Sequence, residues 1–143
     1  NNPMNINGFH VDNILNITPK EAYRLCIEEG AAIIDVREPE LREYKQFDIP
    51  KVFYFRLKDI VNQNVTFPSE PLLIFADATG LRSKQAAAYA KNAGLQNIAN
   101  MAGGIIEWDR DGLPLKVDHD KRMSDKKLHE IKQEIRQKYS KDE

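Results

Sequence analysis

Segments that favour β-strands alternate along this chain with segments that favour α-helices, and this alternation restricts the fold more than any other feature. Continuous apolar runs at 31–36 and 72–76 are typical of strands covered on both faces, as the strands of parallel sheets are. A capping box at 18–21 begins one helix, and an alanine-rich segment at 83–93 predicts another. The remaining predicted elements are strands at 14–17, 52–55 and 97–100, a short exposed helix at 38–46, and helical segments at 57–61 and 104–110.

This order predicts a three-layer α/β/α domain around a central, five-stranded, mostly parallel sheet. The chain has 143 residues, a size typical of one domain. We expect that domain to occupy residues 14–115. Residues 1–13 then form an N-terminal extension, and residues 116–143 form a polar, highly charged tail.

The tail contains apolar residues at helical spacing, namely Leu128, Ile131 and Ile135. With Ser124 as N-cap, they predict an amphipathic helix over 124–139. The apolar stripe of this helix has two equally plausible partners, its own domain or another protein.

Composition excludes several classes of function. A formal net charge of −1 gives no reason to expect nucleic-acid binding, and no apolar run approaches the ~20 residues of a membrane span. The only cysteine, Cys26, leaves no internal disulfide, and His10, His119 and His129 are not at zinc-ligand spacing with it. The first residues lack the basic and apolar regions of a signal peptide. We therefore expect a cytoplasmic domain without metal or cofactor.

The residues most suited to binding follow the apolar run at 72–76. In α/β sheets, ligands bind at the carboxyl ends of strands, where a loop leads into a helix. Small residues there allow successive backbone N–H groups to face inward around an anion, and an arginine adds positive potential. The predicted anion-binding loop, called the 77–83 loop below, consists of Asp77, Ala78, Thr79, Gly80, Leu81, Arg82 and Ser83.

In this loop the chain resembles the rhodanese superfamily, whose active loop follows the pattern Cys-x-x-Gly-x-Arg-Ser. Gly80, Arg82 and Ser83 match that pattern. The resemblance extends from about residue 14 to 115 and implies the rhodanese-like α/β fold. Other segments that match the family are Asp35-Val36-Arg37, Gly94-Leu95-Gln96-Asn97-Ile98, Gly103-Gly104-Ile105-Ile106-Glu107-Trp108 and Gly112-Leu113-Pro114.

The resemblance places Asp77 at the position of the family's catalytic cysteine. Rhodaneses carry sulfur as a cysteine persulfide, and a carboxylate cannot form one. We therefore expect a domain without sulfurtransferase activity that acts in regulation, protein interaction or anion sensing. Its partners would be a small anion in the loop, a protein or a fused domain. We also expect the loop N–H groups and Arg82 to keep Asp77 ionised, with a pKa below about 3.9.

Other interpretations remain open. One is that Asp77 simply caps a helix and has no other role. Another is that the protein is a sulfurtransferase with atypical chemistry. A less favoured alternative is an aspartate-nucleophile phosphatase, which would need Mg²⁺ ligands and a lysine. Cys26 is expected to be a buried hydrophobic residue, Arg37 a structural ion-pair partner and Trp108 part of the core.

Overall fold

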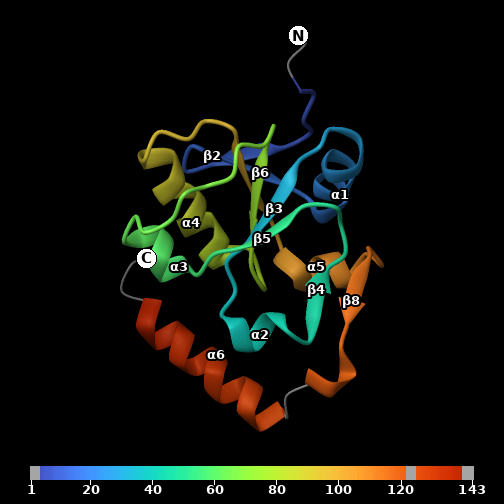
Figure 1. Ribbon diagram of the computed structural model, residues 1–143, viewed down its shortest axis with the longest axis vertical. Helices are drawn as coiled ribbons and strands as arrows, with labels where there is room; N and C mark the ends of the chain where they lie inside the picture. Colours follow the sequence, from blue (N-terminus) through green and yellow to red (C-terminus); the bar gives the residue numbers. More distant parts are fainter. Residues whose placement is uncertain (1–3, 122–124, 140–143) are drawn as a thin grey trace.

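A six-stranded sheet runs through the middle of the molecule in the computed structural model, which describes residues 4–121 and 125–139 (Figure 1). The strand order is β1-β2-β7-β6-β3-β5. The last five strands are mutually parallel, and β1 joins the edge of the sheet antiparallel to β2. The strands span Phe9–Val11 (β1), Ile14–Ile17 (β2), Ala32–Asp35 (β3), Val52–Tyr54 (β5), Leu73–Ala76 (β6) and Ile98–Met101 (β7).

The five parallel strands confirm the predicted sheet, and β1 is an addition that the sequence analysis did not predict. It comes from the expected N-terminal extension and is exposed along its whole length. A two-residue turn, Asp12-Asn13, connects it to β2, with positive φ angles of 52° and 65°. Aspartate and asparagine tolerate this backbone conformation and favour such hairpin turns. Phe9 and Val11 alternate with His10, but a pattern of three residues is too short to predict a strand.

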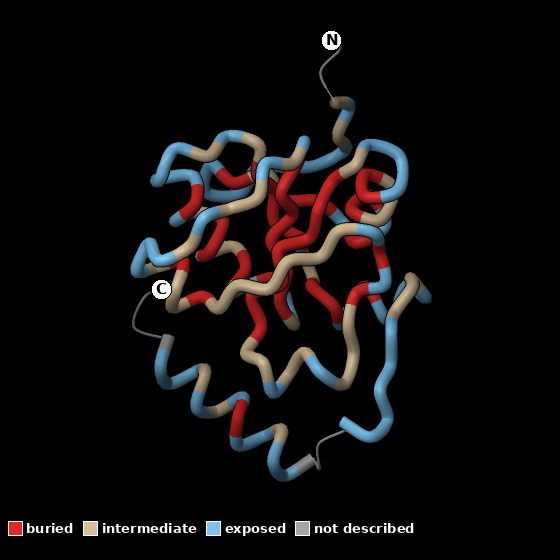
Figure 2. The backbone as a smooth tube through the Cα atoms, viewed as in Figure 1, coloured by how far each residue is buried: buried red, intermediate tan, exposed pale blue. Residues whose placement is uncertain are grey.

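Helices cover both faces of the sheet. On β6, Leu73 and Phe75 belong to one core cluster, whereas Ile74 and Ala76 belong to the other, as expected for side chains that alternate across a strand. The first cluster also holds residues of α3 (Leu57–Val61) and α4 (Leu81–Asn92). The second holds residues of α1 (Pro19–Glu28) and α5 (Gly104–Arg110). Buried backbone is accordingly concentrated in and around the sheet (Figure 2).

The helix predicted at 38–46 is largely wrong. Only α2 (Pro39–Arg42) is helical, and β4 (Lys45–Phe47) pairs antiparallel with β8 (Leu115–Val117) in a second, two-stranded sheet. Phe47 is buried and its ring meets Trp108 edge-on, with centroids 5.0 Å apart. A long-range aromatic contact therefore decided the conformation of a segment whose charged composition suggested an exposed helix.

The tail forms a helix that packs on its own domain. After a short 3-10 turn, η1 (His119–Lys121), helix α6 (Asp125–Tyr139) crosses one end of the molecule beside α2 (Figure 1). Ile131 is only 9% exposed, and Ile135 packs against the core cluster of α3 and α4. The predicted N-cap, Ser124, lies outside the described residues. Within 4–121 and 125–139, no helix is long and apolar enough to cross a bilayer.

Candidate functional site

The 77–83 loop connects β6 to α4 at the carboxyl edge of the parallel strands, as predicted. Its tight path depends on Gly80, whose φ is +93°. A Cβ atom there would lie 2.9 Å from the backbone nitrogen of Gly103 and from the carbonyl oxygen of Met101. A side chain at position 80 would therefore be both strained and crowded.

The start of α5, where Gly103 and Gly104 are adjacent, holds the loop from the other side. The backbone N–H groups of Ile105 and Ile106 donate to the carbonyl oxygens of Asp77 and Ala78, at 2.9 and 3.1 Å. A Cβ atom on Gly104 would lie within 2.6 Å of Ala78 carbonyl atoms, so only glycine permits this approach. These two hydrogen bonds attach the 77–83 loop to the start of α5.

The carboxyl group of Asp77 fills the centre of the 77–83 loop. Its Oδ1 accepts the backbone N–H of Gly80 at 2.5 Å, and its Oδ2 accepts the backbone N–H of Arg82 at 3.0 Å. The Oγ of Ser83 lies 3.1 Å from Oδ1. Asp77 is 5% exposed, so backbone donors that could surround an external anion instead hold the protein's own side chain.

The expected depression of the Asp77 pKa is wrong. Burial, which penalises the charged carboxylate, raises the pKa of Asp77 above its ordinary value. The hydrogen bonds from Gly80, Arg82 and Ser83 lower this pKa and the charge of Asp35 raises it, but the net shift is upward, with burial its largest cause. The loop donors therefore compensate only part of the cost of ionising this group.

A network of buried polar side chains lies beneath the loop. The amide nitrogen of Asn100 donates to Gly80 O at 3.1 Å and to Asn16 Oδ1 at 2.8 Å, so Asn100 Oδ1 is the atom that faces Ser83. Ser83 Oγ donates to that oxygen at 2.5 Å and to Asp77 Oδ1 at 3.1 Å. Because a hydroxyl group has one proton, Asn100 competes with Asp77 for it.

Sequence analysis missed Asn16 and Asn100. Both are buried, lie in register on the adjacent strands β2 and β7, and connect the 77–83 loop to the far edge of the sheet. A polar residue in a short apolar strand was the available signal, because a buried amide needs partners. The pairing of β2 with β7 could not be read from the local pattern.

The other residues singled out from the sequence are structural. Arg37 forms a buried ion pair with Asp35 at 2.8 Å and also donates to the carbonyl oxygens of Leu41 and Lys45, as expected of a structural ion-pair partner. Trp108 is buried in the core, and its indole N–H donates to Pro114 O.

Cys26 is a buried residue of α1, 4% exposed, which confirms the sequence-based interpretation. Burial raises the pKa of its thiol to about 12, although the charge of Lys51 acts in the opposite direction. At neutral pH this thiol therefore stays protonated and is a poor nucleophile. Within the described residues, no group of three histidine, cysteine or carboxylate side chains could hold a metal ion.

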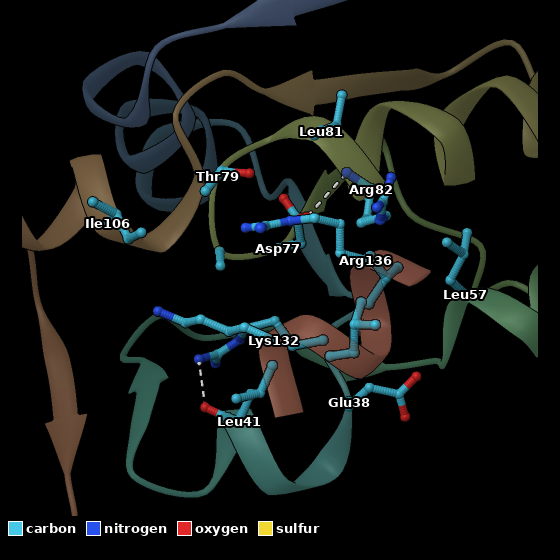
Figure 3. A pocket seen from close by; sticks show the side chains of 14 residues that line it. Glu38, Leu41, Leu57, Asp77, Thr79, Leu81, Arg82, Ile106, Lys132 and Arg136 are labelled. Carbon is cyan, nitrogen blue, oxygen red and sulfur yellow. Dashed lines mark hydrogen bonds between the residues drawn. The ribbon is translucent and has the colours of Figure 1, made fainter. Parts of the chain in front are cut away.

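A cavity of about 290 Å³ opens in front of the 77–83 loop (Figure 3). The loop and the end of β3 form its inner side, α2 and α3 form two further walls, and α6 closes it from outside. The cavity thus places loop residues next to tail residues that are far apart in the sequence. Its lining comprises Val36, Arg37, Glu38, Leu41, Leu57, Asp77, Ala78, Thr79, Leu81, Arg82, Ile106, Lys132, Ile135 and Arg136.

Comparison with known proteins identifies the family. A family model for the rhodanese-like domain matches residues 18–111. A sulfurtransferase of Allochromatium vinosum is 33% identical over 92 residues, which cover 64% of this chain and 84% of the relative. The thiosulfate sulfurtransferase GlpE of Actinobacillus succinogenes is 28% identical over 105 residues, or 71% of this chain and 89% of the relative.

Solved structures agree on the fold. The crystal structure of a rhodanese-like domain protein from Staphylococcus aureus aligns with a TM-score of 0.60 and 23% identity. The alignment covers 72% of this chain and 97% of that one. With a mostly parallel sheet flanked by helices and a family match across most of its length, the chain belongs to the rhodanese-like domain family.

Proposed function

We propose that this chain is a rhodanese-family domain that does not transfer sulfur and instead acts as a binding module in regulation, protein interaction or anion sensing. Asp77 occupies the position of the family's persulfide-forming cysteine. The observation that carries the proposal is the buried carboxyl group of Asp77 in the centre of the 77–83 loop, bonded to Gly80 and Arg82.

Sulfur transfer requires a nucleophile that the sulfur atom can be bonded to and released from. The nearest equivalent in the loop is a carboxyl group, which forms no persulfide. Cys26 offers no substitute, because its thiol is buried in α1 and its pKa is raised to about 12. The 77–83 loop therefore has no thiol sulfur that could carry the transferred sulfur atom, whatever activity its sulfurtransferase relatives have.

The structure gives less support to the alternative of an aspartate-nucleophile phosphatase than to a binding module. An aspartate-nucleophile phosphatase needs an exposed carboxylate and a magnesium site. Asp77 is buried, and Asp35, whose charge acts on Asp77, is already paired with Arg37. The 77–83 loop thus has the geometry of a filled cap rather than that of an accessible nucleophile.

The test is a thiosulfate:cyanide sulfurtransferase assay on the full chain. We expect no thiocyanate above the buffer background from the wild-type protein, from Asp77→Ala or from Cys26→Ser. Thiocyanate formation above background by the wild-type protein would contradict the proposal. Its loss in Asp77→Ala would show that Asp77 takes part, and its loss in Cys26→Ser would identify Cys26 as the sulfur carrier.

A further inference from the structure

The cavity between the 77–83 loop and α6 combines apolar walls with positive charge. We propose that it binds a small organic anion, a ligand with an apolar body and one negatively charged group. This inference rests on the proposed function, because a module without transfer chemistry acts through what it binds. At about 290 Å³ the cavity is near the lower end of the range for small-molecule sites.

Exposed apolar side chains mark the part that would hold the body of the ligand. Leu81, on the first turn of α4, is 46% exposed, and Ile106, on α5, is 43% exposed. They line the same cavity together with Leu57 and Ile135. Covering such surface removes it from water and so favours binding. Two half-exposed apolar residues from different helices at one opening are suited to an apolar ligand.

Positive charge comes from α6. Lys132 and Arg136 are four residues apart, so they lie on the same face of the helix. Both side chains extend from α6 into the space in front of Asp77 (Figure 3). Neither is in an ion pair with any other residue that the structure describes. They are therefore available to a negatively charged group.

The loop itself does not supply the anion-binding donors. Asp77 already accepts the N–H groups of Gly80 and Arg82, so an inorganic anion cannot displace it without leaving a buried carboxyl group unsatisfied. The charged group of the ligand must instead face Lys132 and Arg136, with its apolar body against Leu81 and the other walls.

The tail therefore determines the class of ligand. Residues 18–111 match the family model, whereas α6 lies wholly beyond them. A second cavity, of about 230 Å³, continues under the same helix and shares Lys132 and Ile106 with the first. The hollow under α6 thus extends along the helix and leaves room for a body larger than a single inorganic ion.

The experiment uses the full chain and three probes that separate the need for an apolar body from the need for a negative charge. Naphthalene-2-sulfonate has an apolar body and a charge, naphthalene-2-sulfonamide has the body alone, and inorganic sulfate has the charge alone. We expect calorimetry to detect binding of the sulfonate, with the sulfonamide and sulfate each at least tenfold weaker. Raising the salt concentration should weaken binding of the sulfonate, because its partners on α6 are exposed.

Two double variants test the site. Lys132→Gln with Arg136→Gln should weaken binding of the sulfonate at least tenfold. Lys116→Gln with Lys126→Gln removes the same charge from exposed positions outside the cavity and should leave affinity within twofold. Equal affinity for the sulfonamide, equal affinity for sulfate, or an unchanged affinity in the first double variant would each overturn the proposal. None of these outcomes affects the thiocyanate assay, so the two proposals can fail separately.

Discussion

The protonation of Asp77 can be tested by comparing the pH dependence of stability in the wild-type protein and in Asp77→Asn. Asparagine keeps the shape of the side chain, but in either orientation it leaves one of the two N–H groups, of Gly80 or Arg82, without an acceptor. That loss costs about 1 kcal/mol at every pH. The pH-dependent part of the difference belongs to the carboxyl group alone.

The sign follows from burial. Because the pKa of Asp77 is raised in the folded state, the folded protein holds this proton at pH values at which the unfolded chain has released it. The stabilising contribution of Asp77 is then complete below the unfolded pKa of about 3.9 and is lost as pH rises through the folded pKa. Within that window, the unfolding free energy of the wild type should fall relative to the variant by up to about 1.4 kcal/mol per pH unit.

Urea unfolding at pH 4, 5, 6 and 7 measures this difference. Asp77→Ala is the companion variant, since it removes both acceptor oxygens. Its unfolding free energy should lie about 2–4 kcal/mol below that of the wild type, with the same dependence on pH as that of Asp77→Asn. A wild-type advantage that grows between pH 4 and pH 7 would refute the reasoning, because it would mean that the folded protein stabilises the carboxylate.

Four further predictions concern the 77–83 loop and other parts of the chain. Asp77→Cys should react with iodoacetamide at pH 7 more slowly than a free thiol, because the burial that raises the pKa of Asp77 also penalises a thiolate at this position; a rate above that of glutathione would mean that the loop N–H groups outweigh burial. Cys26 should stay unlabelled by a thiol reagent until denaturant is added, and rapid labelling in buffer would contradict its burial. A chain that ends at Lys121, after β8, should remain folded but lose about 2–3 kcal/mol with Ile131, as measured by urea unfolding; loss of the circular-dichroism spectrum would show that α6 is part of the core. Phe47→Ala should cost about 3–5 kcal/mol in the same measurement, and a cost below 1 kcal/mol would mean that β4 adds nothing to the core.

The parallel sheet and the position of the candidate site could be predicted from the sequence, because both depend on local patterns. The apolar run that became β6 and the small residues after it identify a strand that ends in a tight loop. Asp77 follows that strand directly, and the single cysteine, Cys26, lies on a helix far from the loop in sequence. These features depend on neighbouring residues, and no tertiary contact was needed to find them.

Contacts between distant segments decided the environment of Asp77, the conformation of β4 and the position of α6. Asp77 lies against segments that the chain brings together only on folding, including the start of α5, and its burial reverses the direction of the pKa shift expected from the loop alone. Phe47 became part of a strand because Trp108 and β8 were available to pack against it. Helix α6 was predicted, but its position was not, since an apolar stripe shows that a helix must pack without showing where. Only the tertiary structure placed Lys132 and Arg136 in front of the loop, because charge and cavity come from segments that are separate in the sequence.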